Sequence, residues 1–189
     1  MFPSPLRVAT YRTLIGLLAC TGIRVGEAIR LDRDDFDPDD GVLTVHFGKF
    51  GKTRELPLHP TAVAAIDRYR RQRDRHQPPA TTPSLFISPA GTRLLYCNVH
   101  ATFRQLRARA GLTPGSGPAR PRIHDLRHSF AVRTLIEAYR DGHDVQHRLA
   151  VLSTYLGHVD PGATYWYLSA APELMVLAAQ RLENQQPRP

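Results

Sequence analysis

Six residues of types that can transfer a phosphoryl group are spread along the chain. They are two arginines, one lysine, two histidines and one tyrosine: Arg24, Lys49, His124, Arg127, His158 and Tyr167. Arginine can hold a phosphate through two aligned hydrogen bonds, and lysine or histidine can exchange a proton with an attacking or departing oxygen. A tyrosine hydroxyl can act as the nucleophile. Together these side chains could cut and rejoin a phosphodiester without a metal ion.

The contexts of these residues are more specific than their types. Arg24 lies in residues 21–27, TGIRVGE, where the glycine should end one helix and Arg24 should start the next. Residues 124–128 read HDLRH, which contains a histidine and an arginine three positions apart. Tyr167 follows His158 by nine residues, and His158 closes the sequence LGH. In this order, the motifs resemble the tyrosine recombinases, also called the phage integrase family.

The resemblance covers positions 24 to 167, nearly the whole chain. It implies a site-specific recombinase or integrase in which Arg24, Arg127 and His158 hold the scissile phosphate. The covalent DNA link would store the energy of the broken bond, so neither ATP nor a metal ion nor another cofactor is expected. The resemblance does not identify the DNA site, nor whether the reaction is integration, excision, resolution or transposition.

The same resemblance assigns the proton transfers. Tyr167 would attack the phosphorus and form a 3′-phosphotyrosine bond. A free tyrosine has a pKa of about 10, so hydrogen bonding by His124 and positive charge from the arginines would have to help it lose a proton. Lys49, in an expected hairpin, would protonate the departing 5′ oxygen. The chain has only two lysines against 23 arginines, and both of them, Lys49 and Lys52, fall in that hairpin.

These residues also allow other interpretations. His124 and His128 are spaced like half of a zinc motif, but the glutamate of the metalloprotease pattern is absent and an arginine lies between them. The acidic run 32–40 has the composition of a solvated turn rather than of a metal site. Glu27 either orients Arg24 or simply caps the helix, and Tyr165 is expected to be a core aromatic residue. Two alternative functions stay open: a type IB topoisomerase-like activity that relaxes DNA, and a non-catalytic DNA-binding module.

Composition favours a polyanionic partner. The formal net charge is +8 and the isoelectric point is about 10.1, and the family resemblance makes double-stranded DNA the expected polyanion. No apolar run is long enough to span a membrane, no signal peptide is recognisable, and the two cysteines, Cys20 and Cys97, lack metal-binding spacing. We therefore expect a cytoplasmic, nucleoid-associated protein with no membrane partner.

Hydrophobic periodicity predicts an α+β fold that is mainly α-helical, with one small antiparallel β-sheet. The expected helices cover residues 7–20, a short stretch from 24, 60–77, 97–110, 124–139, 145–156 and 172–185. The expected strands cover residues 41–47 and 54–58, with a third at 85–87, and residues 32–40 are expected to form a turn.

We expect residues 1–189 to form one catalytic domain, with a core at 7–171 and a C-terminal helix and tail at 172–189. Family members usually carry a separate N-terminal core-binding domain, and the sequence predicts that it is absent here. By the resemblance, the chain should assemble as a tetramer on DNA and remain a monomer without it. The terminal helix would dock on a neighbouring protomer or, alternatively, on its own domain.

Overall fold

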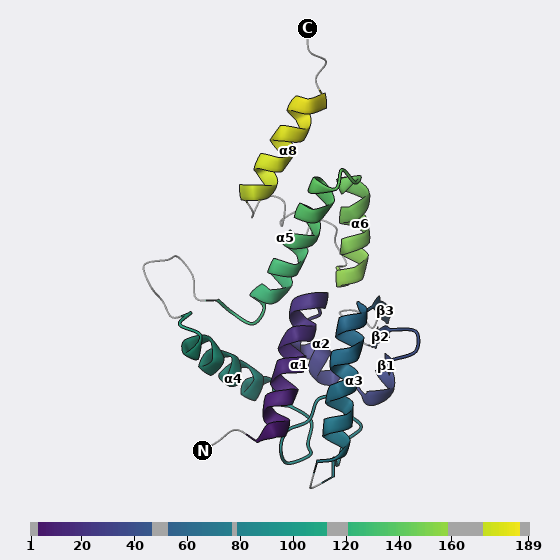
Figure 1. Cartoon of the computed structure of the whole chain (residues 1–189), viewed down its shortest axis with the longest axis vertical. Helices are drawn as coiled ribbons and strands as arrows, with labels where there is room; N and C mark the ends of the chain where they lie inside the picture. The colour runs from purple at the N-terminus through teal and green to yellow at the C-terminus, as the bar shows by residue number, and fades with distance from the viewer. Residues whose placement is uncertain (1–3, 47–52, 77–78, 113–120, 159–171, 186–189) are drawn as a thin grey trace. The chain divides into compact units, whose positions relative to one another are not determined.

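The computed structural model describes residues 4–46, 53–76, 79–112, 121–158 and 172–185. The chain divides into two compact units, residues 1–127 and residues 128–189, and each is described by itself below (Figure 1). The secondary structure is mainly helical with a three-stranded antiparallel sheet, so the predicted fold class is confirmed. None of the described helices is both long enough and apolar enough to cross a membrane.

The first unit is built on helix α1 (Pro5–Thr21), which packs against helix α3 (Pro60–Asp74). Helix α1 begins at a proline, and the Ser4 hydroxyl oxygen before it accepts a hydrogen bond from the Arg7 backbone N–H at 3.2 Å. It ends at Gly22, whose φ of 62° is the left-handed conformation that favours glycine. Helix α2 (Val25–Arg30) follows after only a short break. The predicted helix–break–helix pattern is therefore confirmed.

The sheet of the first unit has the order β1-β2-β3, with β1 at Phe36–Asp37, β2 at Val42–Val45 and β3 at Arg54–Pro57. Leu43 of β2 lies opposite Leu56 of β3, and both side chains are fully buried. Side chains along β2 and β3 alternate between the two faces of the sheet, and one face packs against the core, as the sequences of the strands predict. A 3₁₀ turn, η1 (Arg33–Asp35), precedes β1. Strand β1 lies inside the acidic run that was expected to be only a turn.

The strand expected at residues 85–87 was predicted wrongly, because only two isolated bridges form nearby, Asp32 with Ser84 and Ile87 with Arg93. All three apolar side chains of this segment are fully buried. The backbone N–H of Leu85 donates to the carbonyl of Leu31, and that of Ile87 donates to the Tyr69 hydroxyl. A loop and a side chain therefore satisfy backbone groups that a neighbouring strand would otherwise bind. Helix α4 (Tyr96–Arg109) then completes this unit.

The second unit contains most of helix α5 (Asp125–Arg140), together with α6 (Val145–Leu156) and α8 (Pro172–Gln185). Its core combines apolar side chains from all three helices: Ala131, Leu135, Val145, Leu149, Leu152, Leu156 and Leu174. The Asp144 carboxylate caps the start of α6, and Gly157, with a φ of 67°, ends it. The bounds of α6 and α8 agree with the predicted ones, and for α6 the reason is that its capping residues are local in sequence.

Helix α8 buries only some of its apolar side chains among those that the structure describes. Leu174 is buried in the core of the second unit, whereas Met175 is 61% exposed and Val176 is 55% exposed. A helix buries residues three or four apart on one face, so the neighbour of a buried residue points away from the core. The exposed pair leaves apolar surface on α8.

Candidate active site

Arg24 is placed by the break between two helices. It is the last non-helical residue before α2, with the extended backbone angles φ −69° and ψ 141°. Its side chain is 30% exposed, so the guanidinium remains accessible from solvent. Gly22 makes this placement possible, because its left-handed backbone ends α1 and redirects the chain two residues earlier.

Glu27 fulfils both roles that the sequence left open. Its Oε2 accepts the backbone N–H of Arg24 at 3.0 Å, which caps the start of α2. Its Oε1 accepts Nη1 of the Arg24 side chain at 3.0 Å, which orients the guanidinium. The Glu27 side chain is only 2% exposed, so the carboxylate that binds Arg24 is buried.

A second arginine, Arg54 of β3, donates a hydrogen bond to each oxygen of the same carboxylate. Its Nη1 lies 3.2 Å from Oε1 of Glu27, and its Nη2 lies 2.8 Å from Oε2. Burial by itself would raise the pKa of Glu27, but hydrogen bonds from Arg54 and from the Arg24 backbone, together with the charges of both arginines, outweigh it and lower that pKa. Sequence reasoning missed Arg54. The available signal was that a buried acidic residue needs a positive partner, yet nothing local pointed to a residue 27 positions away.

Arg127 reaches the same helix break from the other end of the first unit. Its side chain is buried at 3% exposure, and its Nη1 donates to the carbonyl oxygen of Gly22 at 2.8 Å. Gly22 lies two residues before Arg24, so both arginines predicted for the site are held at one break in the chain. The structure thus brings together two motifs that are 105 positions apart.

His124 lies in the turn before α5 and not in the helix itself, where it had been expected. Partial burial and then the charge of Arg127 lower the pKa of His124 below its usual value, and Arg24 adds a smaller effect in the same direction. The carbonyl oxygen of His124 accepts the backbone N–H of Arg127 at 3.1 Å, which fixes the turn next to that arginine. A lowered pKa keeps the imidazole neutral near neutral pH, so its ring can accept a proton.

Of the other three predicted residues, one lies in the second unit and two lie outside the described residues. His158 follows the glycine that ends α6 in the second unit, is half-buried, and donates its backbone N–H to the carbonyl of Ser153 at 3.0 Å. Lys49 and Tyr167 lie outside the described residues, as do Lys52 and Tyr165. Arg24, His124 and Arg127 form the part of the candidate site that lies in the first unit.

The zinc alternative gains no support from this geometry. Among the residues that the structure describes, no group of three or more His, Cys, Asp or Glu side chains is arranged to hold a metal ion. His124 precedes the helix that carries His128, so the two do not form the expected pair on one helical face.

Comparison with known proteins gives the family. The sequence model of the phage integrase family matches residues 5–173. Tyrosine recombinase XerD of Mycobacterium tuberculosis is 34% identical over 158 residues, covering 82% of this chain and 46% of that protein. A protein of Sinorhizobium fredii, provisionally named integrase/recombinase y4rB, is 43% identical over 180 residues, covering 95% of this chain and 57% of that protein. The chain belongs to the phage integrase family.

Solved structures agree with this assignment. The crystal structure of XerA recombinase covers 96% of this chain with a TM-score of 0.73, and at 24% identity it supports the fold alone. XerH site-specific recombinase, in a pre-cleavage complex with its difH substrate, is 26% identical over 88% of this chain, with a TM-score of 0.67. The chain spans about half the length of the curated relatives it matches, 57% of one and 46% of the other.

Proposed function

We propose that residues 1–189 are the catalytic domain of a site-specific DNA recombinase that cuts and rejoins strands through a 3′-phosphotyrosine bond. The observation that carries the proposal is that Arg24 and Arg127 are held at one helix break, with the carbonyl oxygen of His124 bound to the Arg127 backbone N–H. Two guanidinium groups at one place are suited to a phosphate, because each can donate two aligned hydrogen bonds to its oxygens. Membership of the phage integrase family supports the same chemistry.

The proposed reaction begins at the tyrosine. Tyr167 attacks the scissile phosphorus while the neutral His124 accepts the phenolic proton, and the bond from phosphorus to the 5′ oxygen breaks. Lys49 gives a proton to that departing oxygen. Arg24 and Arg127 stabilise the negative charge that builds up on the phosphoryl oxygens, and His158 donates a further hydrogen bond. In the reverse step a 5′ hydroxyl of a second strand attacks the phosphotyrosine and gives its proton to Lys49, while Tyr167 leaves and regains its proton from His124.

Double-stranded DNA is the proposed substrate. The net charge of +8 suits a polyanion, and the related XerH was crystallised on a DNA site. Exposed arginines extend beyond the site, among them Arg104 and Arg109 of α4. The proposal places the protein in the cytoplasm at the nucleoid, where such a substrate lies.

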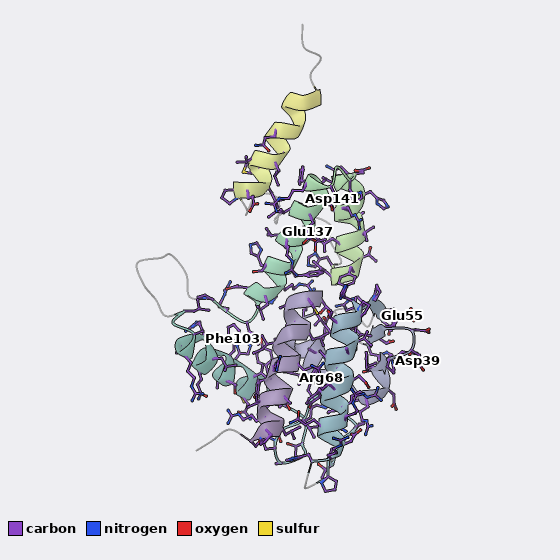
Figure 2. All side chains as sticks on the ribbon, viewed as in Figure 1. Asp39, Glu55, Arg68, Phe103, Glu137 and Asp141 are labelled. Carbon is purple, nitrogen blue, oxygen red and sulfur yellow. The ribbon has the colours of Figure 1, made fainter. Side chains whose placement is uncertain are left out.

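We also propose that the chain assembles as a tetramer on DNA and is a monomer without it. Helix α8 carries exposed Met175 and Val176, which a second copy could cover. In the first unit a groove of about 690 Å³ runs between α1 and α3, and small and apolar residues such as Val8, Ala9 and Ala65 line it. Arg68 stands on α3 at this groove (Figure 2). By this proposal residues 7–171 are the catalytic core and residues 172–189 the exchanged segment.

A nicked suicide duplex tests the catalytic proposal. The wild-type chain should form a covalent protein–DNA adduct in the presence of EDTA, and the Tyr167→Phe variant should not. A plasmid without a partner site then separates recombination from the topoisomerase alternative, because only a topoisomerase would relax it efficiently. If no adduct forms with any of several DNA sites used by members of the phage integrase family, the non-catalytic DNA-binding module is favoured.

A further inference from the structure

We propose that Arg54 is a positioning residue for strand transfer, which fixes Glu27 and, through Glu27, the guanidinium of Arg24. The inference rests on the proposed recombinase function. It concerns a residue that is not expected to touch the DNA, because 13% of the Arg54 side chain is exposed and its guanidinium is directed at a buried carboxylate.

The contact geometry makes Glu27 a shared acceptor. Oε1 accepts Nη1 of Arg24 at 3.0 Å and Nη1 of Arg54 at 3.2 Å. Oε2 accepts the backbone N–H of Arg24 at 3.0 Å and Nη2 of Arg54 at 2.8 Å. Arg54 therefore grips both oxygens in a fork and sets the plane of the carboxylate. The orientation of that plane decides where Arg24 points, since one backbone and one side-chain contact tie Arg24 to it.

Removal of Arg54 would leave Glu27 in an unfavourable state. The carboxylate is only 2% exposed, and burial raises the pKa of such a group unless positive charge opposes it. Without the fork of Arg54, Glu27 would bind a proton more readily, and a protonated carboxyl would lose its ion pair with Arg24. Arg24 would then be held less firmly against the phosphate, and a displacement of about 1 Å at a reacting group can cost about 10²-fold in rate.

The place of Arg54 in the sheet extends its influence. Arg54 is the first residue of β3 and lies opposite Val45, the last residue of β2. It thus closes the strand pair at the end nearest residues 47–52, the segment that contains Lys49. Its neighbour Glu55 is exposed (Figure 2), whereas the Arg54 guanidinium contacts the buried carboxylate of Glu27. One ion pair therefore ties the strand next to the proposed proton donor to the helix that holds Arg24.

The test compares single-turnover cleavage of a nicked suicide duplex by the 189-residue chain and three variants. Arg54→Gln removes the charge, and Arg54→Lys keeps the charge but loses the fork. Arg33→Gln is the matched control, because Arg33 forms an ion pair with Asp74 at 3.1 Å in the same unit and its side chain contacts neither Glu27 nor α2. Thermal melting and DNA affinity are measured for every variant, the affinity in a Tyr167→Phe background.

We expect Arg54→Gln to cleave about 10- to 100-fold more slowly, Arg54→Lys to fall between it and the wild type, and Arg33→Gln to cleave at the wild-type rate. The Arg54→Gln defect should shrink as pH rises from about 5 to about 8, because a higher pH ionises Glu27 again. DNA affinity should stay within about 2-fold, since the phosphate contacts that dominate binding are kept.

Two further experiments test whether Arg54 affects the cleavage rate through Glu27 and Arg24. In a Glu27→Gln background, Arg54→Gln should cause little additional loss, because its only proposed target is gone. A substrate with a bridging 5′ sulfur needs no proton donor, so it should restore little of the Arg54→Gln rate if Arg54 acts on Arg24. Full restoration by sulfur would overturn the path through Arg24 and assign the effect to the Lys49 segment.

The outcomes separate the two proposals. If the wild-type chain forms no adduct, the proposed function fails. If the wild type reacts and folded Arg54→Gln or folded Arg54→Lys reacts equally fast, the positioning role of Arg54 is refuted. A loss that is independent of pH, or one that persists in full without Glu27, also overturns it, because a general stabiliser or a direct DNA contact would behave in that way.

Discussion

Replacement of Arg127 by lysine separates the catalytic from the structural part of this buried arginine. Arg127 is 3% exposed and donates to the Gly22 carbonyl at 2.8 Å, so truncation to alanine would leave that carbonyl without this donor. A hydrogen bond from a charged group contributes about 1.5–3 kcal/mol, which is the expected loss in the free energy of unfolding for Arg127→Ala. Lysine keeps the positive charge and a single donor, and should recover part of that stability.

Cleavage should not recover in the same way. One guanidinium can donate to Gly22 and also present further N–H groups in a fixed plane, whereas an ammonium is a point charge without the fork. We therefore expect Arg127→Lys to cleave at least about 10²-fold more slowly, which corresponds to about 2.7 kcal/mol in the activation barrier. Urea unfolding gives the stability, and single-turnover cleavage of the suicide duplex gives the rate.

The matched control is Arg133→Lys on the same helix α5, because Arg133 is 60% exposed and only approaches Glu137 at 3.9 Å. It should change neither the stability nor the rate appreciably, since exposed ion pairs contribute little. A near-wild-type cleavage rate for Arg127→Lys would refute the argument that the planar fork is needed. The argument would also be refuted if the loss in cleavage rate were no larger than the loss expected from the fraction of unfolded Arg127→Lys protein.

Four further predictions follow from the proposed chemistry. Tyr167→Phe should abolish the covalent DNA adduct on a denaturing gel while DNA binding persists, and Tyr165→Phe should retain it; the reverse pattern would move the nucleophile. Lys49→Ala should slow cleavage strongly and be rescued by a bridging 5′ sulfur, whereas rescue of Lys52→Ala instead would shift the proton donor by three residues. Because the pKa of His124 is lowered, the cleavage rate should fall only when the pH drops below about 6.5, which the acid limb of the pH–rate profile measures. An acid limb with its midpoint above about 6.5 would contradict a neutral imidazole. DNA binding by the isolated chain should be weak, with a dissociation constant of about 10⁻⁴ to 10⁻⁶ M at physiological salt and a steep salt dependence, so nanomolar site-specific binding by fluorescence anisotropy would show that this chain needs no further DNA-binding part.

Sequence alone determined the features that depend on neighbours along the chain. Helix α6 begins after a capping aspartate and ends at a glycine, so its bounds could be predicted from local residues. The motifs at 21–27 and 124–128 indicated the family without any knowledge of the fold, and the family model bears this out. The roles predicted for Lys49 and Tyr167 stay predictions, since both lie outside the described residues.

Tertiary structure decided what depends on the path of the chain in space. Residues 85–87 have the composition of a strand, but they find a loop carbonyl and the Tyr69 hydroxyl as partners instead of another strand. Sequence spacing could not show that Arg127 would bind the Gly22 carbonyl, or that Arg54 would share Glu27 with Arg24. Periodicity and capping act over one or two helical turns, whereas a buried ion pair is set by which distant elements pack together. For that reason the sequence supplied the residues that could hold a phosphate, and only the fold supplied the carboxylate and carbonyl that hold those residues.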